Sequence, residues 1–323
     1  MTMSVRPSPA RVRRLAEELA ESGFALDLDD PRGALLLEDI DYALRPKVHE
    51  RRVSSYGSIV DPTTEPGTWD AGASLTITRR QVDGMPLVGA RRFADGLSSW
   101  LIRRSDDADE WAIFDRPSGS ERDLVVLADV LGATLVQRHP AGVVRVVGSH
   151  GVLRWDGLGW RHEPPISTWI DSVSACSLRS DLGVLETLLE FAVHDLGARG
   201  IGAILVYRPD GNPAPGAQER LALPPPLQVT KPADLAPLRH ALAQVDGAAV
   251  LDGHGTLRQL GVRLVPTPEA ESTVEGYRGM RHTAGRRYSY DDPAATVIVV
   301  SEDGPVTVLR NGKVIGSSPA PAG

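Results

Sequence analysis

The chain reads Val245-Asp246-Gly247-Ala248-Ala249-Val250 in its C-terminal half. The apolar run that ends this stretch is typical of a buried strand, and the residues before it have helical periodicity. Because Gly247 has no side chain, a ligand can approach the backbone closely beside the carboxylate of Asp246. Asp-Gly is also a common turn dipeptide, but this pair follows a helix and heads a strand. The stretch therefore predicts a reactive carboxylate at the edge of a sheet.

Two later stretches also combine apolar residues with a compact polar cluster. They read Gly279-Met280-Arg281-His282-Thr283-Ala284 and Val299-Val300-Ser301-Glu302-Asp303-Gly304. We expect the first to be a polar loop whose arginine and histidine bind phosphate oxygens. We expect the second to join two strands and to present Glu302. Taken singly, each is explained as well or better by a solvated loop or a hairpin turn.

The two acids at positions 246 and 302 can form one binding site only if they meet at the same sheet edge. Mg²⁺ and Mn²⁺ prefer oxygen ligands, so such a pair of carboxylates would suit either ion. In nucleotidyl transfer a divalent ion draws a 3′-hydroxyl and an α-phosphate together. The sequence therefore predicts a metal site beside a phosphate-binding segment.

The region after Pro164-Pro165 alternates between helical and strand patterns. We expect helices over residues 184–196 and 235–245, each with one apolar face. The expected strands cover residues 201–207, 248–251, 256–260, 296–300 and 306–310. This alternation predicts an α/β domain over residues 166–323, with a mixed central sheet flanked by helices.

The pattern of residues 1–165 predicts a separate α+β domain. No residues in it have the spacing of a catalytic motif. We expect helices over residues 10–22 and 123–131, and a hairpin that closes the domain between residues 143 and 161. Ala34-Leu35-Leu36-Leu37 is strand-like, as are Leu75–Thr78 and Trp111–Phe114. Residues 52–69 are rich in serine, glycine, proline and threonine, and they read as a loop.

Composition restricts the partners of the protein. A chain of 323 residues is long for one core and favours two domains. The net charge of −7 argues against a nucleic-acid-binding surface, although a local basic pocket remains compatible with it. No apolar run approaches the ~20 residues that span a bilayer, and the N-terminus lacks the apolar core of a signal peptide. We therefore expect a cytoplasmic protein with neither a nucleic-acid nor a membrane partner.

The order and the residues of four stretches resemble those of the diadenylate cyclase (DAC domain) family, of the DNA-integrity-scanning-protein nucleotide-binding type. The first is Arg199-Gly200-Ile201-Gly202-Ala203-Ile204-Leu205-Val206, which resembles the strand bordering the family's adenine pocket. Asp246-Gly247-Ala248 resembles its Asp-Gly-Ala motif, and Ser301-Glu302 resembles its Ser-Glu pair. Residues 279–284 resemble its Arg-His-Arg motif, whose loop holds the triphosphate. The likeness extends over about residues 180–316.

The resemblance implies an enzyme that joins two ATP molecules into cyclic di-AMP and releases two pyrophosphates. It implies Asp246 as the catalytic acid and a metal ligand, with Glu302 as the second ligand of Mg²⁺ or Mn²⁺. The ATP-binding residues that it implies are Gly202, Ala203, Ile204, Gly247, Ala248, Gly279, Arg281, His282, Thr283 and Ser301. Because the product has two identical links, the resemblance also implies a face-to-face homodimer or a higher homo-oligomer.

One departure from the family pattern leaves the activity open. Thr283 stands where the family commonly has arginine, and Arg286 or Arg287 would have to supply the missing charge. The first alternative is therefore a catalytically weak or inactive protein that binds ATP or cyclic di-AMP as a sensor. The second is an interaction protein whose motifs are strand-end turns, with Asp246 and Glu302 far apart. For residues 1–165 we expect a sensory or regulatory role.

Overall fold

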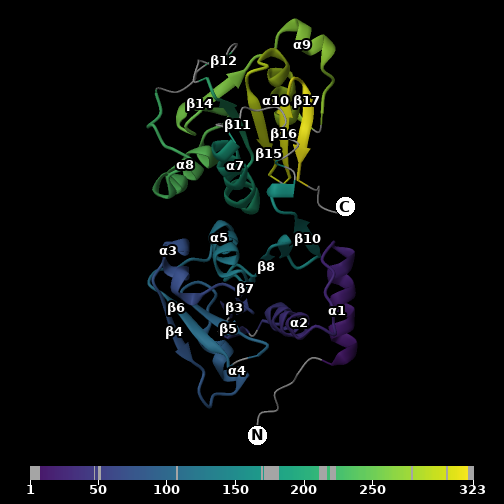
Figure 1. Cartoon of the computed structure of the whole chain (residues 1–323). Helices are drawn as coiled ribbons and strands as arrows, with labels where there is room; N and C mark the ends of the chain where they lie inside the picture. Colours follow the sequence, from purple (N-terminus) through teal and green to yellow (C-terminus); the bar gives the residue numbers. More distant parts are fainter. Residues whose placement is uncertain are drawn as a thin grey trace. The chain divides into compact units, whose positions relative to one another are not determined.

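The chain divides into two compact units, Met1–Pro165 and Ile166–Gly323. The computed structural model describes residues 8–46, 48–49, 52–106, 108–168, 170, 182–210, 217–218, 223–277, 279–302 and 305–318. Figure 1 shows each unit as a sheet with helices against it. Among the helices of the described residues, none combines the length and the apolar character that a membrane span needs.

The N-terminal unit is built on an eight-stranded mixed sheet in the order β10-β9-β8-β7-β3-β5-β6-β4. These strands are β3 (Tyr56–Val60), β4 (Ile77–Gln81), β5 (Ser99–Arg103), β6 (Glu110–Phe114), β7 (Thr134–Arg138), β8 (Val144–Gly148), β9 (Gly151–Trp155) and β10 (Trp160–Glu163). The pair β3 and β5 is parallel, and the other neighbours pair antiparallel. Two short strands, β1 (Val48–His49) and β2 (Arg52–Val53), pair separately.

Helices cover both faces of this sheet. They are α1 (Pro9–Glu21), α2 (Pro31–Leu44), α3 (Trp69–Ala73), α4 (Leu87–Ala90) and α5 (Glu121–Leu131). Buried side chains of α1 and α2 pack with Tyr56, Leu101 and Val136 on one face. Those of α3 and α5 pack with Ile59 and Leu135 on the other. The alternation of strand residues between two faces explains why neighbouring positions in β3 and β7 join different cores.

Two expectations for this unit were wrong. Residues 34–37 lie inside α2 and not in a strand. Asp30 caps this helix through the backbone N–H of Arg32, and Pro31 occupies its first turn, which is a start signal that the apolar run hid. Residues 52–69 are not a loop throughout, because β3 lies within them and is buried at every position. A strand buried on both faces shows no period-two alternation.

The C-terminal unit is an α/β domain with a seven-stranded mixed sheet, as expected. Its order is β12-β14-β13-β11-β15-β16-β17. The strands are β11 (Ala203–Arg208), β12 (Ala217–Gln218), β13 (Ala248–Asp252), β14 (Leu257–Leu264), β15 (Thr296–Val300), β16 (Val306–Arg310) and β17 (Lys313–Ser317). The central strand β11 is parallel to β13 and antiparallel to β15.

Helices flank this sheet on both sides and complete a three-layer domain (Figure 1). They are α7 (Leu182–Glu190), continued by a π-helical segment (Phe191–Leu196), then α8 (Pro232–Gln244), α9 (Pro268–Thr273) and α10 (Met280–Asp291). Ala203, Leu205 and Tyr207 face the core that α7 and α8 share, whereas Ile204 and Val206 face the core beneath α10. Gly285 lets α10 approach the sheet, since a Cβ there would lie 2.9 Å from Val299 Cγ2.

Candidate nucleotide site

The sheet register brings three strand ends to one edge. Ile204 pairs with Ala248, and Ala203 pairs with Val300. Because β11 and β13 begin at this edge and β15 ends there, the residues just outside them are neighbours. The edge therefore gathers Gly202, Asp246 and Ser301 from segments up to about a hundred residues apart in the sequence.

A cavity of about 620 Å³ opens at this edge. Its apolar wall comes from β11, β13, β14 and β15, and consists of Ile204, Ala248, Val262, Leu264 and Val300. Its polar lining is Asp246, Arg263, Gly279, Arg281, His282 and Ser301. An apolar wall beside a few converging polar groups is the usual form of a ligand site. The wall suits a base, and the arginines suit phosphates.

A second cavity, of about 500 Å³, shares Asp246, Gly247 and Arg281 with the first and also contains Glu302. Gly202 contributes to its lining as well. The two acids thus line one cavity at one sheet edge, as the metal hypothesis requires. Asp303 and Gly304, which we expected to form the adjoining turn, lie outside the described residues.

Arg281 and Glu302 form an ion pair inside this second cavity. Arg281 Nη1 donates to Glu302 Oε1 at 2.7 Å. A Cβ on Gly202 would lie 2.3 Å from Arg281 Nη1 and 2.9 Å from Glu302 Cγ, so the pair crosses the bare backbone of this glycine. Both side chains are well exposed, at 41% and 65%. Exposed pairs contribute about 0.2–1 kcal/mol, so a ligand can displace this one at little cost.

The segment that we expected to be a polar loop begins a helix instead. Met280 is the first residue of α10, and Gly279 is its N-cap with φ of 134°. No side chain caps this end, and the first turn contains no acidic residue. The free N–H groups of a helix start and the helix dipole both favour an anion. Together with Arg281, this end of α10 gives the larger cavity a wall whose charge and donors suit an anion.

His282 is held in place from behind the cavity. It is 7% exposed, its Nε2 lies 3.3 Å from Thr307 Oγ1, and its ring makes an edge contact with Tyr277. The histidine lines the larger cavity and is fixed by Tyr277, which precedes α10, and by Thr307 on β16.

Thr283 lies outside the lining of both cavities. Its Oγ1 accepts from the backbone N–H of Tyr277 at 3.0 Å and lies 3.3 Å from the carbonyl oxygen of the same residue. Arg286 donates to the carbonyls of Gly312 and Glu275. Arg287 donates to carbonyls of residues 274 and 271. These three side chains hold the backbone around α10, and neither arginine supplies charge to the cavities.

Ala203 also lies outside the two linings, because its side chain is buried in the core on the α7 side. Only the backbone of this residue is suitably placed for a ligand at the sheet edge.

The protein offers two carboxylates and no complete cage for a divalent ion. Among the described residues, no group of three or more histidine, cysteine, aspartate or glutamate side chains could hold a metal. Mg²⁺ is usually bound through one or two carboxylates together with substrate phosphates and water. Asp246 and Glu302 in one cavity fit an ion of that kind, provided that the nucleotide brings the remaining oxygen ligands.

The sequence analysis did not identify three lining residues from β14. These are Val262, Arg263 and Leu264. The strand lies against β13 at an irregular register, and Gly247 allows the approach, since a Cβ there would lie 2.7 Å from the carbonyl carbon of Gly261. The expected strand ended at residue 260, and only the sheet order shows that β14 borders the Asp-Gly-Ala segment.

Residues 190–314 match the family model described as DisA bacterial checkpoint controller nucleotide-binding, or DAC. The matched region contains β11, β13, β15 and α10, which form both cavities. The C-terminal unit carries a DAC domain. Residues 13–163, the N-terminal unit, match a second model described as "Probable sensor domain DACNK".

Two solved structures resemble part of the chain. One is described as a hypothetical membrane spanning protein from Bacillus cereus; it is 20% identical, covers 43% of this chain and 72% of its own, and has a TM-score of 0.32. The other is a double cysteine mutant of DacA from Staphylococcus aureus; it is 20% identical, covers 46% of this chain and 85% of its own, and has a TM-score of 0.26. Both TM-scores are low. No curated protein matches the chain.

Proposed function

We infer that the DAC domain is a diadenylate cyclase, which condenses two ATP molecules into cyclic di-AMP and two pyrophosphates. The observation that supports this best is the shared edge, where Asp246, Glu302 and Arg281 line one cavity beside an apolar pocket. Members of the matched family have this activity. Each 3′-hydroxyl attacks the α-phosphate of the other nucleotide, so that one P–O bond forms, the bond to pyrophosphate breaks and the hydroxyl proton is released.

The larger cavity holds the nucleotide. Its apolar wall receives the adenine, while Arg281, His282 and the N-terminus of α10 receive the triphosphate. Asp246 stands at the junction of the two cavities and holds the attacking hydroxyl end of the nucleotide. Catalysis then rests mainly on positioning and on charge stabilisation.

Asp246 and Glu302 would hold Mg²⁺ or Mn²⁺, and the nucleotide would supply the remaining oxygen ligands. When bound, the ion supplies charge neutralisation at the α-phosphate and lowers the pKa of the hydroxyl. Arg281 must leave Glu302 before that carboxylate can act as a ligand. A phosphate is a stronger partner for the guanidinium than an exposed carboxylate is. Nucleotide binding therefore draws Arg281 away and releases Glu302.

Two copies of the domain face each other in this proposal. The product has two identical phosphodiester links, and an isologous interface presents two ATP molecules in equivalent positions. The test is to incubate the purified chain with ATP and either ion, and to separate the nucleotides by chromatography. Formation of cyclic di-AMP that requires the ion supports the proposal, and ATP that stays intact at every protein concentration contradicts it.

A second candidate is a sensor that binds ATP or cyclic di-AMP without turnover. Thr283, Arg286 and Arg287 favour it, because all three bond to backbone near α10 and leave the triphosphate wall with less charge than the family pattern has. Calorimetry that shows nucleotide binding, combined with chromatography that shows no product, would favour the sensor over the enzyme.

A further inference from the structure

The N-terminal unit has a cavity of its own, with a volume of about 680 Å³. It lies between the first turns of α1, one face of α2 and the end of β5. Val12, Leu28 and Leu35 form its apolar wall, and Ala34 stands at its mouth. Small-molecule sites usually measure about 300–1,000 Å³ and place a few polar groups in an apolar lining. The volume and the wall both match that description.

The lining contains two arginines, the exposed Arg13 and the more enclosed Arg104. Arg104 is 18% exposed, and no hydrogen bond of its guanidinium occurs among the described residues. Its ion-pair partner is Glu110, and Nη2 lies 3.7 Å from the nearer oxygen, beyond hydrogen-bonding distance. Glu110 is already engaged by Arg79 at 3.2 Å and by Gln81 at 2.9 Å. The guanidinium of Arg104 therefore has donors that a ligand in the cavity can use.

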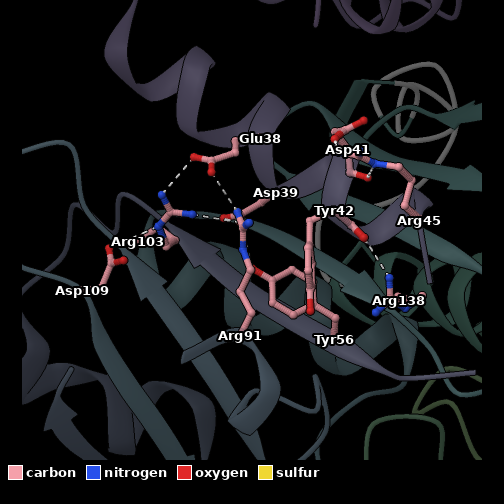
Figure 2. Close-up of polar contacts among 10 residues, drawn as sticks. All are labelled: Glu38, Asp39, Asp41, Tyr42, Arg45, Tyr56, Arg91, Arg103, Asp109 and Arg138. Atoms are coloured by element: carbon pink, nitrogen blue, oxygen red, sulfur yellow. Dashed lines mark hydrogen bonds and ion pairs between the residues drawn. The ribbon is translucent and has the colours of Figure 1, made fainter. Parts of the chain in front are cut away.

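The lining contains two acidic residues, the exposed Asp29 and Glu38, and Glu38 is compensated from the opposite side. Its carboxylate oxygens lie 3.3 Å from Arg103 Nη2 and 3.6 Å from Arg91 Nη2. The same two arginines bind Asp39 at 3.1 and 2.6 Å, and Tyr56 donates to Asp39 at 2.8 Å. Figure 2 shows Glu38 and Asp39 reaching from α2 toward these arginines. The charge of Glu38 is therefore already paired within the protein, whereas Asp29 is exposed to solvent.

We propose that this cavity binds a small organic carboxylate with an apolar body. The carboxylate lies on the guanidinium of Arg104, whose planar fork matches two carboxylate oxygens. The apolar body lies against Val12, Leu28 and Leu35. The site belongs to the unit that matches a sensor family, and the proposal does not depend on the activity of the DAC domain.

The first test compares three probes on the full chain by isothermal titration calorimetry. Octanoate combines both features, octylamine carries the opposite charge on the same body, and acetate lacks the body. The proposal requires octanoate to bind at one molecule per chain and at least about tenfold more tightly than either comparison probe. No binding of octanoate, or equal binding of octylamine, overturns the proposal.

Two variants locate the site. Arg104→Gln removes the charge and should weaken octanoate binding by about tenfold or more. Ala34→Trp fills the mouth of the cavity from an exposed helix position and should abolish binding without a change in the core. The control is Arg92→Gln, which removes an exposed charge of the same unit outside the cavity lining and should bind octanoate like the original chain. Unchanged binding in Ala34→Trp shows that octanoate binds elsewhere and overturns the proposal, whatever Arg104→Gln does to folding.

Discussion

Arg281 Nη1 lies 2.7 Å from Glu302 Oε1, so the arginine expected to bind phosphate holds the carboxylate expected to bind metal. The pair is exposed, and such pairs contribute about 0.2–1 kcal/mol. A triphosphate next to α10 can therefore take the arginine and free the acid. This relationship couples the two halves of the proposed site through one side chain.

Glu302→Gln separates the two roles of that pair. Without its ion-pair partner, Arg281 is free in the resting protein, and ATP binding in the absence of metal should tighten by up to about fivefold. Product formation with Mn²⁺ should fall at least about tenfold, because one metal ligand is lost. Calorimetry and chromatography measure the two effects, and Glu186→Gln, an exposed change on α7, is the matched control. Product formation at the original rate would exclude Glu302 as a ligand.

Gly202→Ala tests the crossing of the ion pair over bare backbone. The added Cβ would lie 2.3 Å from Arg281 Nη1, so the guanidinium must move. We expect ATP affinity to fall about tenfold, while the melting temperature changes little because both side chains are exposed. Gly183→Ala is the control, since a Cβ there meets no atom within 4 Å. Equal ATP affinity in the two variants would count against the proposed position of the phosphate.

Asp39→Ala should destabilise the N-terminal unit strongly. The carboxylate is 0% exposed and binds Arg91 and Arg103 (Figure 2). These buried arginines would lose their fully buried partner and keep only the more exposed Glu38 and Asp109. Removing one partner of a buried pair costs about 3–5 kcal/mol. Urea unfolding measures the loss, and Asp83→Ala, at an exposed position, should stay within about 0.5 kcal/mol of the original chain. A loss below about 1 kcal/mol for Asp39→Ala would contradict the account of the cluster.

The buried carboxyl of Glu163 should make the free energy of unfolding of the N-terminal unit depend on pH. Burial raises the pKa of this carboxyl from 4.5 to about 7, against the opposing effect of the Arg154 guanidinium. The folded state therefore favours the protonated carboxyl of Glu163. The stabilising contribution of this protonated carboxyl is present below pH 4.5 and is lost as the pH rises from 4.5 to 7. Glu163→Gln should gain up to about 3 kcal/mol over the original chain at pH 8 and almost nothing at pH 4.5.

Urea unfolding of Glu163→Gln and the original chain at both pH values measures this gain. Comparison at equal pH cancels the contribution of His150, whose pKa burial lowers to about 4. Glu17→Gln, at an exposed position on α1, is the control and should show no such difference. A gain that is the same at both pH values would refute the assignment to Glu163.

The strand-end residues of the site could be predicted from the sequence because each motif adjoins a regular element. The helical periodicity before Asp246 indicated a helix, and the continuous apolar runs of β13 and β15 indicated buried strands. The helix α10 had no such signal, because its sequence is polar and Gly285 interrupts it. Its helical state depends on packing of Gly285 and Tyr288 against the sheet, which is tertiary information.

The contribution of β14 and the roles of the arginines could not be read from the sequence for the same reason. Arg281 binds Glu302, whereas Arg286 and Arg287 bind backbone carbonyls, although all three belong to one basic segment. Arg286 and Arg287 are adjacent, and they follow Arg281 by five and six residues on α10, which are not multiples of the helical repeat, so the three side chains point in different directions. Which face meets the cavity is decided by the sheet order.

The most direct test of the central claim is the yield of cyclic di-AMP from ATP and Mn²⁺ with the original chain and with Asp246→Asn. The exchange keeps the shape of an exposed side chain and removes its charge, and Glu186→Gln again controls for loss of an acid elsewhere in the unit. The account predicts product from the original chain and the control, and none from Asp246→Asn despite an unchanged melting temperature. Product from Asp246→Asn at the original rate would contradict it.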